Sequence, residues 1–215
     1  DASQSGNYRN VLVVVDVFSR FAWAVPMESK TQEATIAALR SVLASSGRKP
    51  AELSTDGGQE FGAAFTAFLE QRGVAHRVKR PEHTNALAVV DAVIRRLKET
   101  LRQDMIDEGT QNWAKFLPRA VRAHNSNSHE HLMDSAPADV KGNEVLQYAL
   151  KKQAGQEALA NTKQHADRVA ALRKAGAFRV LLPTKSFTRT TTARWSNEVH
   201  KVAGFVGTDV LDEQG

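Results

Sequence analysis

Cysteine is absent from this 215-residue sequence. Its absence excludes disulfides, thiol nucleophiles and zinc sites that need thiolate ligands. Apolar residues make up 41% of the chain, enough for a core, but no run of 18 or more of them occurs, so we expect no membrane-spanning helix. The first ten residues are polar and show no signal peptide. Because residue 1 is not methionine, we expect a fragment of a longer polypeptide.

The small excess of positive charge is unevenly distributed along the chain. Residues 1–150 hold 18 Lys or Arg and 18 Asp or Glu, whereas residues 151–215 hold 11 and 6. A neutral body with a basic tail suits a polyanionic substrate such as nucleic acid. Three histidines, His124, His129 and His131, lie in a polar stretch without metal-ligand spacing. We expect them to be solvated loop residues rather than zinc ligands.

Hydrophobic periodicity predicts a layered α/β domain. Residues 11–15 form a β-branched run without alternation, which is typical of a strand buried on both faces. A second strand at 21–26 precedes a helix that Thr31 caps and that ends near Ser46. The order of strands and helices that follows indicates a mixed sheet flanked by helices. The remaining elements that we expect are strands at 53–55 and 74–78 and helices at 62–72, 86–105 and 113–124.

The character of the chain changes beyond residue 140. Residues 143–175 have high helix propensity and many polar side chains, so we expect a helical linker. Residues 176–215 contain two predicted strands, 177–182 and 198–211, separated by a basic stretch. We therefore divide the chain into a core at 1–142, the linker at 143–175 and a small β module at 176–215. We expect this module to be incomplete at Gly215.

Three aspartates stand out by their positions. Asp16 ends the first buried strand, Asp56 ends another strand before a Gly-Gly turn, and Asp91 lies in the first turns of the 86–105 helix. Each alone is more often a turn or helix-start residue. Converging carboxylates repel one another unless a cation lies between them, and Mg²⁺ is the cation that prefers such oxygen ligands. Taken together, the three favour a metal site.

The helix at 86–105 carries two adjacent rows of side chains. The row that we expect to be buried has members at i, i+4, i+7 and i+11: Val90, Ile94, Leu97 and Leu101. The next row lies about 100° around the helix, and its members are Asp91, Arg95, Lys98 and Arg102. Such a row can bind metal at one end and DNA phosphates along the rest. The alternative is a solvated basic face with intrahelical ion pairs.

These segments resemble a known family. The stretches 13–21 and 54–61 are similar to the first two signatures of retroviral and LTR-retrotransposon integrases. Residues 88–91, followed by Leu97-Lys98, resemble the third signature. The similarity covers roughly residues 8–142. A weaker resemblance, at 194–196, 199–202 and 210–212, is to the C-terminal domain of gypsy-like integrases.

The resemblance implies an RNase H-like fold. We expect a mixed five-stranded sheet flanked by helices, then the linker helix and a small, truncated SH3/chromo-like β module. The implied activity is that of an integrase, a polynucleotidyl transferase with endonuclease activity. It processes the 3′ ends of element DNA and joins them to target DNA. Two Mg²⁺ or Mn²⁺ ions would be held by Asp16, Asp56 and Asp91, and no nucleotide cofactor is implied.

Further residues and partners follow from the resemblance. Arg95 and Lys98 fall at helix positions that contact element-end DNA in the family, and Glu60 falls beside the metal ligands. The implied partners are element-end DNA, target DNA and further copies of the chain, with no membrane. We expect a fragment of an element polyprotein that acts in the nucleus. Candidate DNA-binding residues in the basic tail are Arg189, Arg194 and Lys201.

The sequence departs from the family at its third carboxylate. Asp91 stands where the family has glutamate, and 34 residues instead of the usual 35 separate it from Asp56. One alternative function is therefore a decayed or domesticated integrase that only binds DNA or a partner. Another is a related RNase H-like transposase or nuclease.

Overall fold

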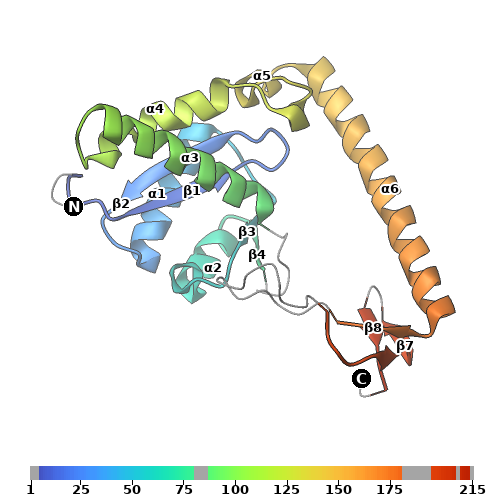
Figure 1. Cartoon of the computed structure of the whole chain (residues 1–215). Helices are drawn as coiled ribbons and strands as arrows, with labels where there is room; N and C mark the ends of the chain where they lie inside the picture. Colours follow the sequence, from blue (N-terminus) through green and yellow to red (C-terminus); the bar gives the residue numbers. More distant parts are fainter. Residues whose placement is uncertain (1–4, 80–86, 181–194, 207–208, 214–215) are drawn as a thin grey trace. The chain divides into compact units, whose positions relative to one another are not determined.

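The chain folds into two compact units, Asp1–Gln147 and Tyr148–Gly215. The structure, a computed structural model, describes residues 5–79, 87–180, 195–206 and 209–213. The first unit is a mixed α/β domain, and Figure 1 gives the order of its elements.

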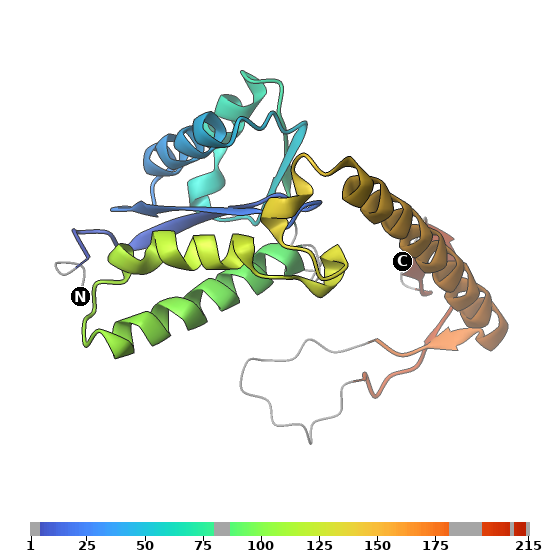
Figure 2. The same cartoon turned by 90° about the horizontal axis from the view of Figure 1, so that it is seen from above.

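The first unit is built around one pair of antiparallel strands. Strand β1 (Asn10–Val15) pairs with β2 (Ala22–Met27), with Val13 opposite Ala24. Because side chains alternate along a strand, Leu12 belongs to one hydrophobic cluster, whereas Val13 packs against another. Figure 2 shows α1 (Gln32–Ser46) and α2 (Ala63–Glu70) on one face of the pair, and α3 (Ala88–Asp107) and α4 (Trp113–Ser126) on the other. Both faces of β1 are thus covered by helices, as predicted, but only Leu12 is buried and its other side chains are half-buried.

A second ladder carries the next candidate residue. Strand β3 (Glu52–Thr55) runs parallel to β4 (Ala75–Val78), and the connection contains the short helix η1 (Gln59–Phe61) and α2. A parallel pair requires such a crossover. The family resemblance implies one sheet of five strands. The described residues of this unit contain the four strands that the hydrophobic pattern predicts, in two separate pairs.

Helix α1 begins and ends where local chemistry requires. The Oγ1 of Thr31 accepts a hydrogen bond from the Ala34 N–H at 3.3 Å, as expected of an N-cap residue. The helix ends at Gly47, whose φ of 63° is in the left-handed region that favours glycine. The next residue, Arg48, thus leaves the helix axis and lies beside Asp16.

Helix α3 is rotated slightly from the predicted orientation. Its buried residues are Val93, Leu97, Leu101 and Asp104, whereas Val90 and Ile94 are only half-buried. The predicted stripe was therefore wrong in its first two members. The reason is that α3 packs against α4 as well as β1, and Val93, Leu97 and Leu101 share one cluster with side chains of α4. The buried Asp104 carboxylate pairs with Arg119 of α4.

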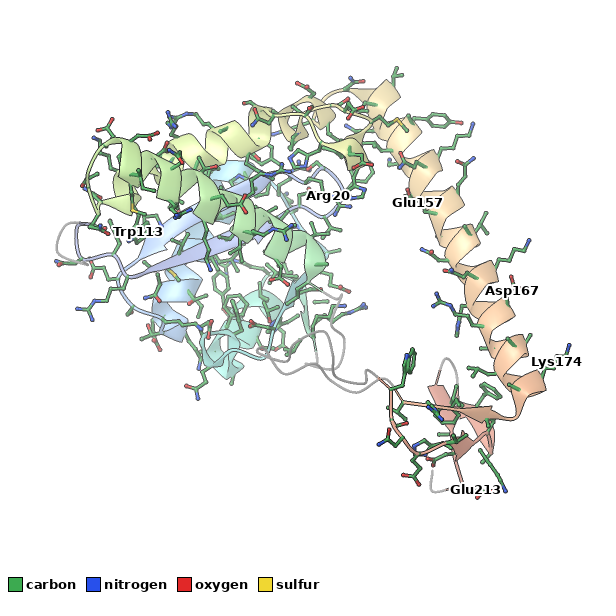
Figure 3. The ribbon with its side chains drawn as sticks, in the orientation of Figure 1. Arg20, Trp113, Glu157, Asp167, Lys174 and Glu213 are labelled. Atoms are coloured by element: carbon green, nitrogen blue, oxygen red, sulfur yellow. The ribbon has the colours of Figure 1, made fainter. Side chains whose placement is uncertain are left out.

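Helix α4 hydrogen-bonds to the buried edge of β2 that faces away from β1. The Ala22 N–H donates to Asn125 Oδ1 at 2.8 Å, and Asn125 Nδ2 donates to the Ala22 carbonyl at 2.9 Å. The neighbouring His124 is 2% exposed, and its Nε2 lies 3.0 Å from the carbonyl of Arg20. Arg20 is labelled in Figure 3. Our expectation of a solvated loop histidine was wrong for His124, because α4 continues through Ser126 and carries that side chain into the core.

Two short helices complete the first unit, η2 (Glu130–Leu132) and α5 (Pro137–Val140). Helix α6 (Glu144–Ala175) then begins in the first unit and continues into the second. Most of its side chains are exposed, although Leu150 is buried, and Figure 3 labels three charged ones, Glu157, Asp167 and Lys174. No helix in the described part of the chain is long and apolar enough to span a membrane.

The second unit ends in two small antiparallel ladders. They join β5 (Ala177–Phe178) to β6 (His200–Lys201) and β7 (Gly204–Val206) to β8 (Asp209–Leu211). The Phe178 and His200 rings stack at 5.5 Å, and His200 Nδ1 lies 2.8 Å from an Asp212 carboxylate oxygen. These strands are shorter than predicted, and the described residues do not form a closed barrel.

The Asn125 contact gives a test of the fold. Asn125→Ala leaves the buried N–H and C=O of Ala22 without partners, so we expect the free energy of unfolding to fall by about 2–4 kcal/mol. Urea denaturation measures this change. The exposed Arg122, three residues earlier on α4, supplies the control, and Arg122→Ala should change stability by less than about 0.5 kcal/mol. Equal stability of the two variants would contradict the role given to Asn125.

Candidate functional site

Asp16 lies at the end of β1, in the turn that leads to β2. Its Oδ1 accepts hydrogen bonds from the backbone N–H groups of Phe18 and Ser19, both at 3.0 Å. Its Oδ2 lies 3.1 Å from Nη1 of Arg48, and 23% of its side chain is exposed. The carboxylate is therefore fixed in orientation by the turn, and a cation already lies beside it.

Arg48 is a residue of the site that sequence reasoning missed. It follows the left-handed Gly47 at the end of α1, and this position directs its guanidinium toward Asp16. Its Nε is buried and has no hydrogen-bond partner in the described part of the chain. The sequence around it predicts a helix end and gives no signal of this pairing. The Arg48 guanidinium thus compensates the charge of the Asp16 carboxylate.

Asp56 occupies an exposed turn directly after β3. Its Oδ1 accepts a hydrogen bond from the Gly58 N–H at 3.1 Å, which is the pattern of an Asx turn. The preceding residue, Thr55, is buried, and its Oγ1 donates to the Asp56 carbonyl at 2.9 Å. Asp56 therefore presents its carboxylate to solvent from a turn whose base is anchored in the core.

Glu60 lies beneath the Asp56 turn. It is 8% exposed, and its Oε1 lies 2.9 Å from Nζ of Lys30. The pKa of Lys30 is raised by the hydrogen bond to Glu60 and by its charge, with a further contribution from Asp56. A Cβ at Gly58 would come within 2.5 Å of the Glu60 carboxylate. Glycine at 58 is thus what allows this carboxylate to pack against the turn.

Asp91 lies in the first turn of α3 and is exposed. It is part of the predicted row, whose exposed cations Arg95, Lys98 and Arg102 follow along one face of the helix. The row borders a hollow of about 370 Å³, which Ile94 and Glu99 also line. The three cations that follow Asp91 are spaced so that they can contact successive phosphates of a nucleic-acid strand.

The three aspartates are not assembled into one cluster. Within residues 5–79, 87–180, 195–206 and 209–213, no group of three or more His, Asp or Glu side chains is placed to hold a metal ion. The donor types suit a hard divalent cation, since all three are carboxylates and at least two are exposed. Binding a shared ion would require the three carboxylates to come closer together, and Arg48 lies on Oδ2 of Asp16, one of the oxygens that the ion would use.

Of the three candidate residues of the basic tail, the structure describes Lys201. Lys201 lies on β6, is exposed, and its Nζ is 3.9 Å from Oε1 of Glu213. Arg189 and Arg194 lie outside the described residues.

Comparison with known proteins supports the resemblance over the first part of the chain. Residues 2–84 match the integrase core domain family. The match includes Asp16 and Asp56 and ends before Asp91. Over 117 residues, the chain is 29% identical to the Gag-Pol polyprotein of avian reticuloendotheliosis virus, covering 54% of this chain and 10% of that polyprotein. The chain thus spans about a tenth of the length of this relative.

Two solved structures have a similar fold. The HTLV-2 integrase catalytic core domain in complex with magnesium, in its trimeric form, superposes with a TM-score of 0.52 and 19% identity, covering 60% of this chain and 82% of that one. The dimeric form of the same domain superposes with a TM-score of 0.50 and 19% identity, covering 59% of this chain and 80% of that one. The first unit therefore has the mixed α/β fold of an integrase catalytic core, which is RNase H-like. The gypsy-like assignment stays a prediction.

The two glycines after Asp56 allow a matched test of this turn. Gly58→Ala forces the buried Glu60 carboxylate aside, whereas a Cβ at Gly57 meets nothing within 4 Å. We expect Gly58→Ala to lower the free energy of unfolding by about 1–3 kcal/mol and to disturb the Lys30 ion pair. Gly57→Ala should stay within about 0.5 kcal/mol of wild type. Thermal unfolding measures both, and the same loss in both would refute the packing of Glu60 against Gly58.

Proposed function

We propose that the chain contains the catalytic core of a retroelement integrase. Its reaction is divalent-metal-dependent processing of element 3′ ends, followed by their transfer into target DNA. The observation that carries the proposal is the pair Asp16 and Asp56, within a core of integrase fold. Each follows a strand, and each has its Oδ1 held by backbone N–H groups. Such carboxylates keep the remaining lone pairs oriented for a cation.

The proposed cofactors are two Mg²⁺ or Mn²⁺ ions held by Asp16, Asp56 and Asp91. When bound, the ions supply Lewis-acid stabilisation of charge at the phosphate. The protein contributes orientation: the turns fix the carboxylates of Asp16 and Asp56, and the first turn of α3 carries that of Asp91. Asp91 is one methylene shorter than the glutamate of the family, so the start of α3 must lie closer to Asp16 and Asp56 than a glutamate would require.

Substitution of the three aspartates tests the function directly. In a strand-transfer assay with element-end oligonucleotides and Mn²⁺, we expect each of Asp16→Asn, Asp56→Asn and Asp91→Asn to lower the rate about a hundredfold or more, because each removes a metal-binding charge. Asp91→Glu should retain activity. Glu70→Gln, an exposed carboxylate of α2, is the matched control. Full activity in Asp91→Asn would remove Asp91 from the site.

The cationic row of α3 is the proposed contact with element-end DNA. Arg95, Lys98 and Arg102 are exposed on one face of a single helix, beginning one turn from Asp91. A phosphate strand following this face would reach the metal-binding end of the row. Spacing by one helical turn suits contact with the DNA backbone rather than with individual base edges.

Salt dependence tests this contact. If Lys98 neutralises a phosphate, Lys98→Ala should weaken DNA binding and reduce the slope of log K against log salt by about one. Fluorescence anisotropy at several salt concentrations measures the slope. Arg122→Ala on α4 removes an equally exposed charge away from the row and should leave the slope unchanged. A slope that falls equally in both variants would indicate only a general charge effect.

Assembly and the basic tail complete the proposal. Integration joins two DNA ends, so we propose that several copies act together in the host nucleus. Lys201, with Arg189 and Arg194, would add DNA contacts from the tail. The alternative of a decayed integrase that only binds DNA has its support in Asp91 and in the Arg48 pair on Asp16. Binding without metal-dependent nicking would favour that alternative, and nicking without joining would favour a related nuclease.

A further inference from the structure

A chain of hydrogen bonds links the Asp56 turn to a histidine of the neighbouring strand. His76 lies on β4 opposite Leu53 of β3, so its side chain is on the same face as that of Thr55. The Nε2 of His76 is 2.8 Å from Oγ1 of Thr55, and its Nδ1 is 2.7 Å from Oγ1 of Thr66 on α2. The imidazole thus bridges β3 and α2 directly behind the turn.

The direction of these hydrogen bonds follows from the lengths of the bonds around the ring. Thr55 has a single hydroxyl hydrogen, which it donates to the Asp56 carbonyl at 2.9 Å, and its oxygen then accepts from Nε2. The opposite tautomer would give up this bond to keep the longer one from Thr66 to the Gly62 carbonyl, so the lengths favour a proton on Nε2. Nδ1 accepts from Thr66, whose hydroxyl also lies at a longer 3.3 Å from the Gly62 carbonyl. Each group in the chain then has a partner of the opposite kind.

The side chains around His76 keep its imidazole ring in place and favour its neutral form. His76 packs edge-on against Phe65, with ring centroids 5.4 Å apart, and Phe65 is 1% exposed. Burial lowers the pKa of His76 below its ordinary 6.5, so the neutral form with one ring proton is favoured near neutral pH. A fixed ring in one protonation state is suited to orient a partner.

We propose that His76 is a positioning residue that orients the Asp56 carboxylate through Thr55. The proton on Nε2 directs the Thr55 hydroxyl to the Asp56 carbonyl, which sets the backbone from which the Asx turn begins. The proposal deepens the metal-binding function and rests on it for its effect on catalysis. Its structural part, the orientation of the turn, can be measured in the metal-free protein.

Two amide variants separate the two ring nitrogens. His76→Gln can place a donor amide near the position of Nε2 and keep the bond to Thr55, whereas the shorter His76→Asn reaches only the Thr66 side. Both lose the aromatic contact with Phe65. We expect Mn²⁺ affinity to fall about tenfold in His76→Asn and to stay within about twofold of wild type in His76→Gln. Titration with Mn²⁺ alone, followed by electron paramagnetic resonance, measures both.

Thr66→Val is the control for a merely structural role. It removes the bond to Nδ1 and leaves the bond to Thr55, so we expect lower thermal stability with Mn²⁺ affinity within about twofold of wild type. Equal losses of affinity in His76→Asn and His76→Gln would overturn the proposal, because the bond to Thr55 would then not matter. Equal affinity of wild type and Asp56→Asn would instead overturn the proposed metal site.

Nuclear magnetic resonance of the metal-free protein tests the orientation of the Asp56 turn whether or not the protein binds Mn²⁺. Long-range nitrogen–proton correlations should show a neutral His76 with its proton on Nε2. The amide shifts of Asp56 and Gly57 should match wild type in His76→Gln and move in His76→Asn. A proton on Nδ1, or unmoved shifts in His76→Asn, would refute the positioning role.

Discussion

The covering of one strand pair on both faces is the constraint on which the first unit depends. Alternate side chains of β1 enter two different hydrophobic clusters, so neither face of the strand can carry a charge. Charged side chains are therefore confined to the point where the burial ends, and Asp16 is the first residue beyond β1. The same constraint leaves the edge of β2 with unpaired backbone groups at Ala22, which Asn125 satisfies from α4. The covering of both strand faces thus determines where the candidate site lies and which contacts stabilise the core.

Features determined by neighbouring residues were predictable from the sequence. The Thr31 cap, the strand buried on both faces and the strand-end positions of Asp16 and Asp56 all follow from local patterns. Arg48, His76 and Asn125 were not predictable, because their partners are brought close only by tertiary folding; Asn125 bonds across 103 positions and His76 across 21. The orientation of α3 lies between these cases. Its amphipathic pattern predicts a buried face, but packing on α4 decides where the centre of that face lies.

Charge compensation at Asp16 decides what state the site adopts. The Arg48 guanidinium lies 3.1 Å from Oδ2. By Coulomb's law, a divalent ion at a bonding distance of about 2 Å attracts the carboxylate about three times as strongly. The ion must first lose part of its hydration shell, which for Mg²⁺ is costly. Arg48 thus balances the charge of Asp16 and orients its carboxylate without metal, and in the proposed site it would yield where two further carboxylates and DNA phosphate add to the attraction.

The three aspartates differ in how firmly the fold holds them, and this difference bears on the aspartate at the third position of the proposed metal site. Asp16 is held by two backbone N–H groups and Arg48, and Asp56 by the Gly58 N–H above a turn anchored through Thr55 and packed on Glu60. Asp91 projects from the first turn of a helix. A fixed carboxylate tolerates no change of length, since the turn cannot follow it. The start of a helix can shift, so a shorter side chain is least disruptive at the third position.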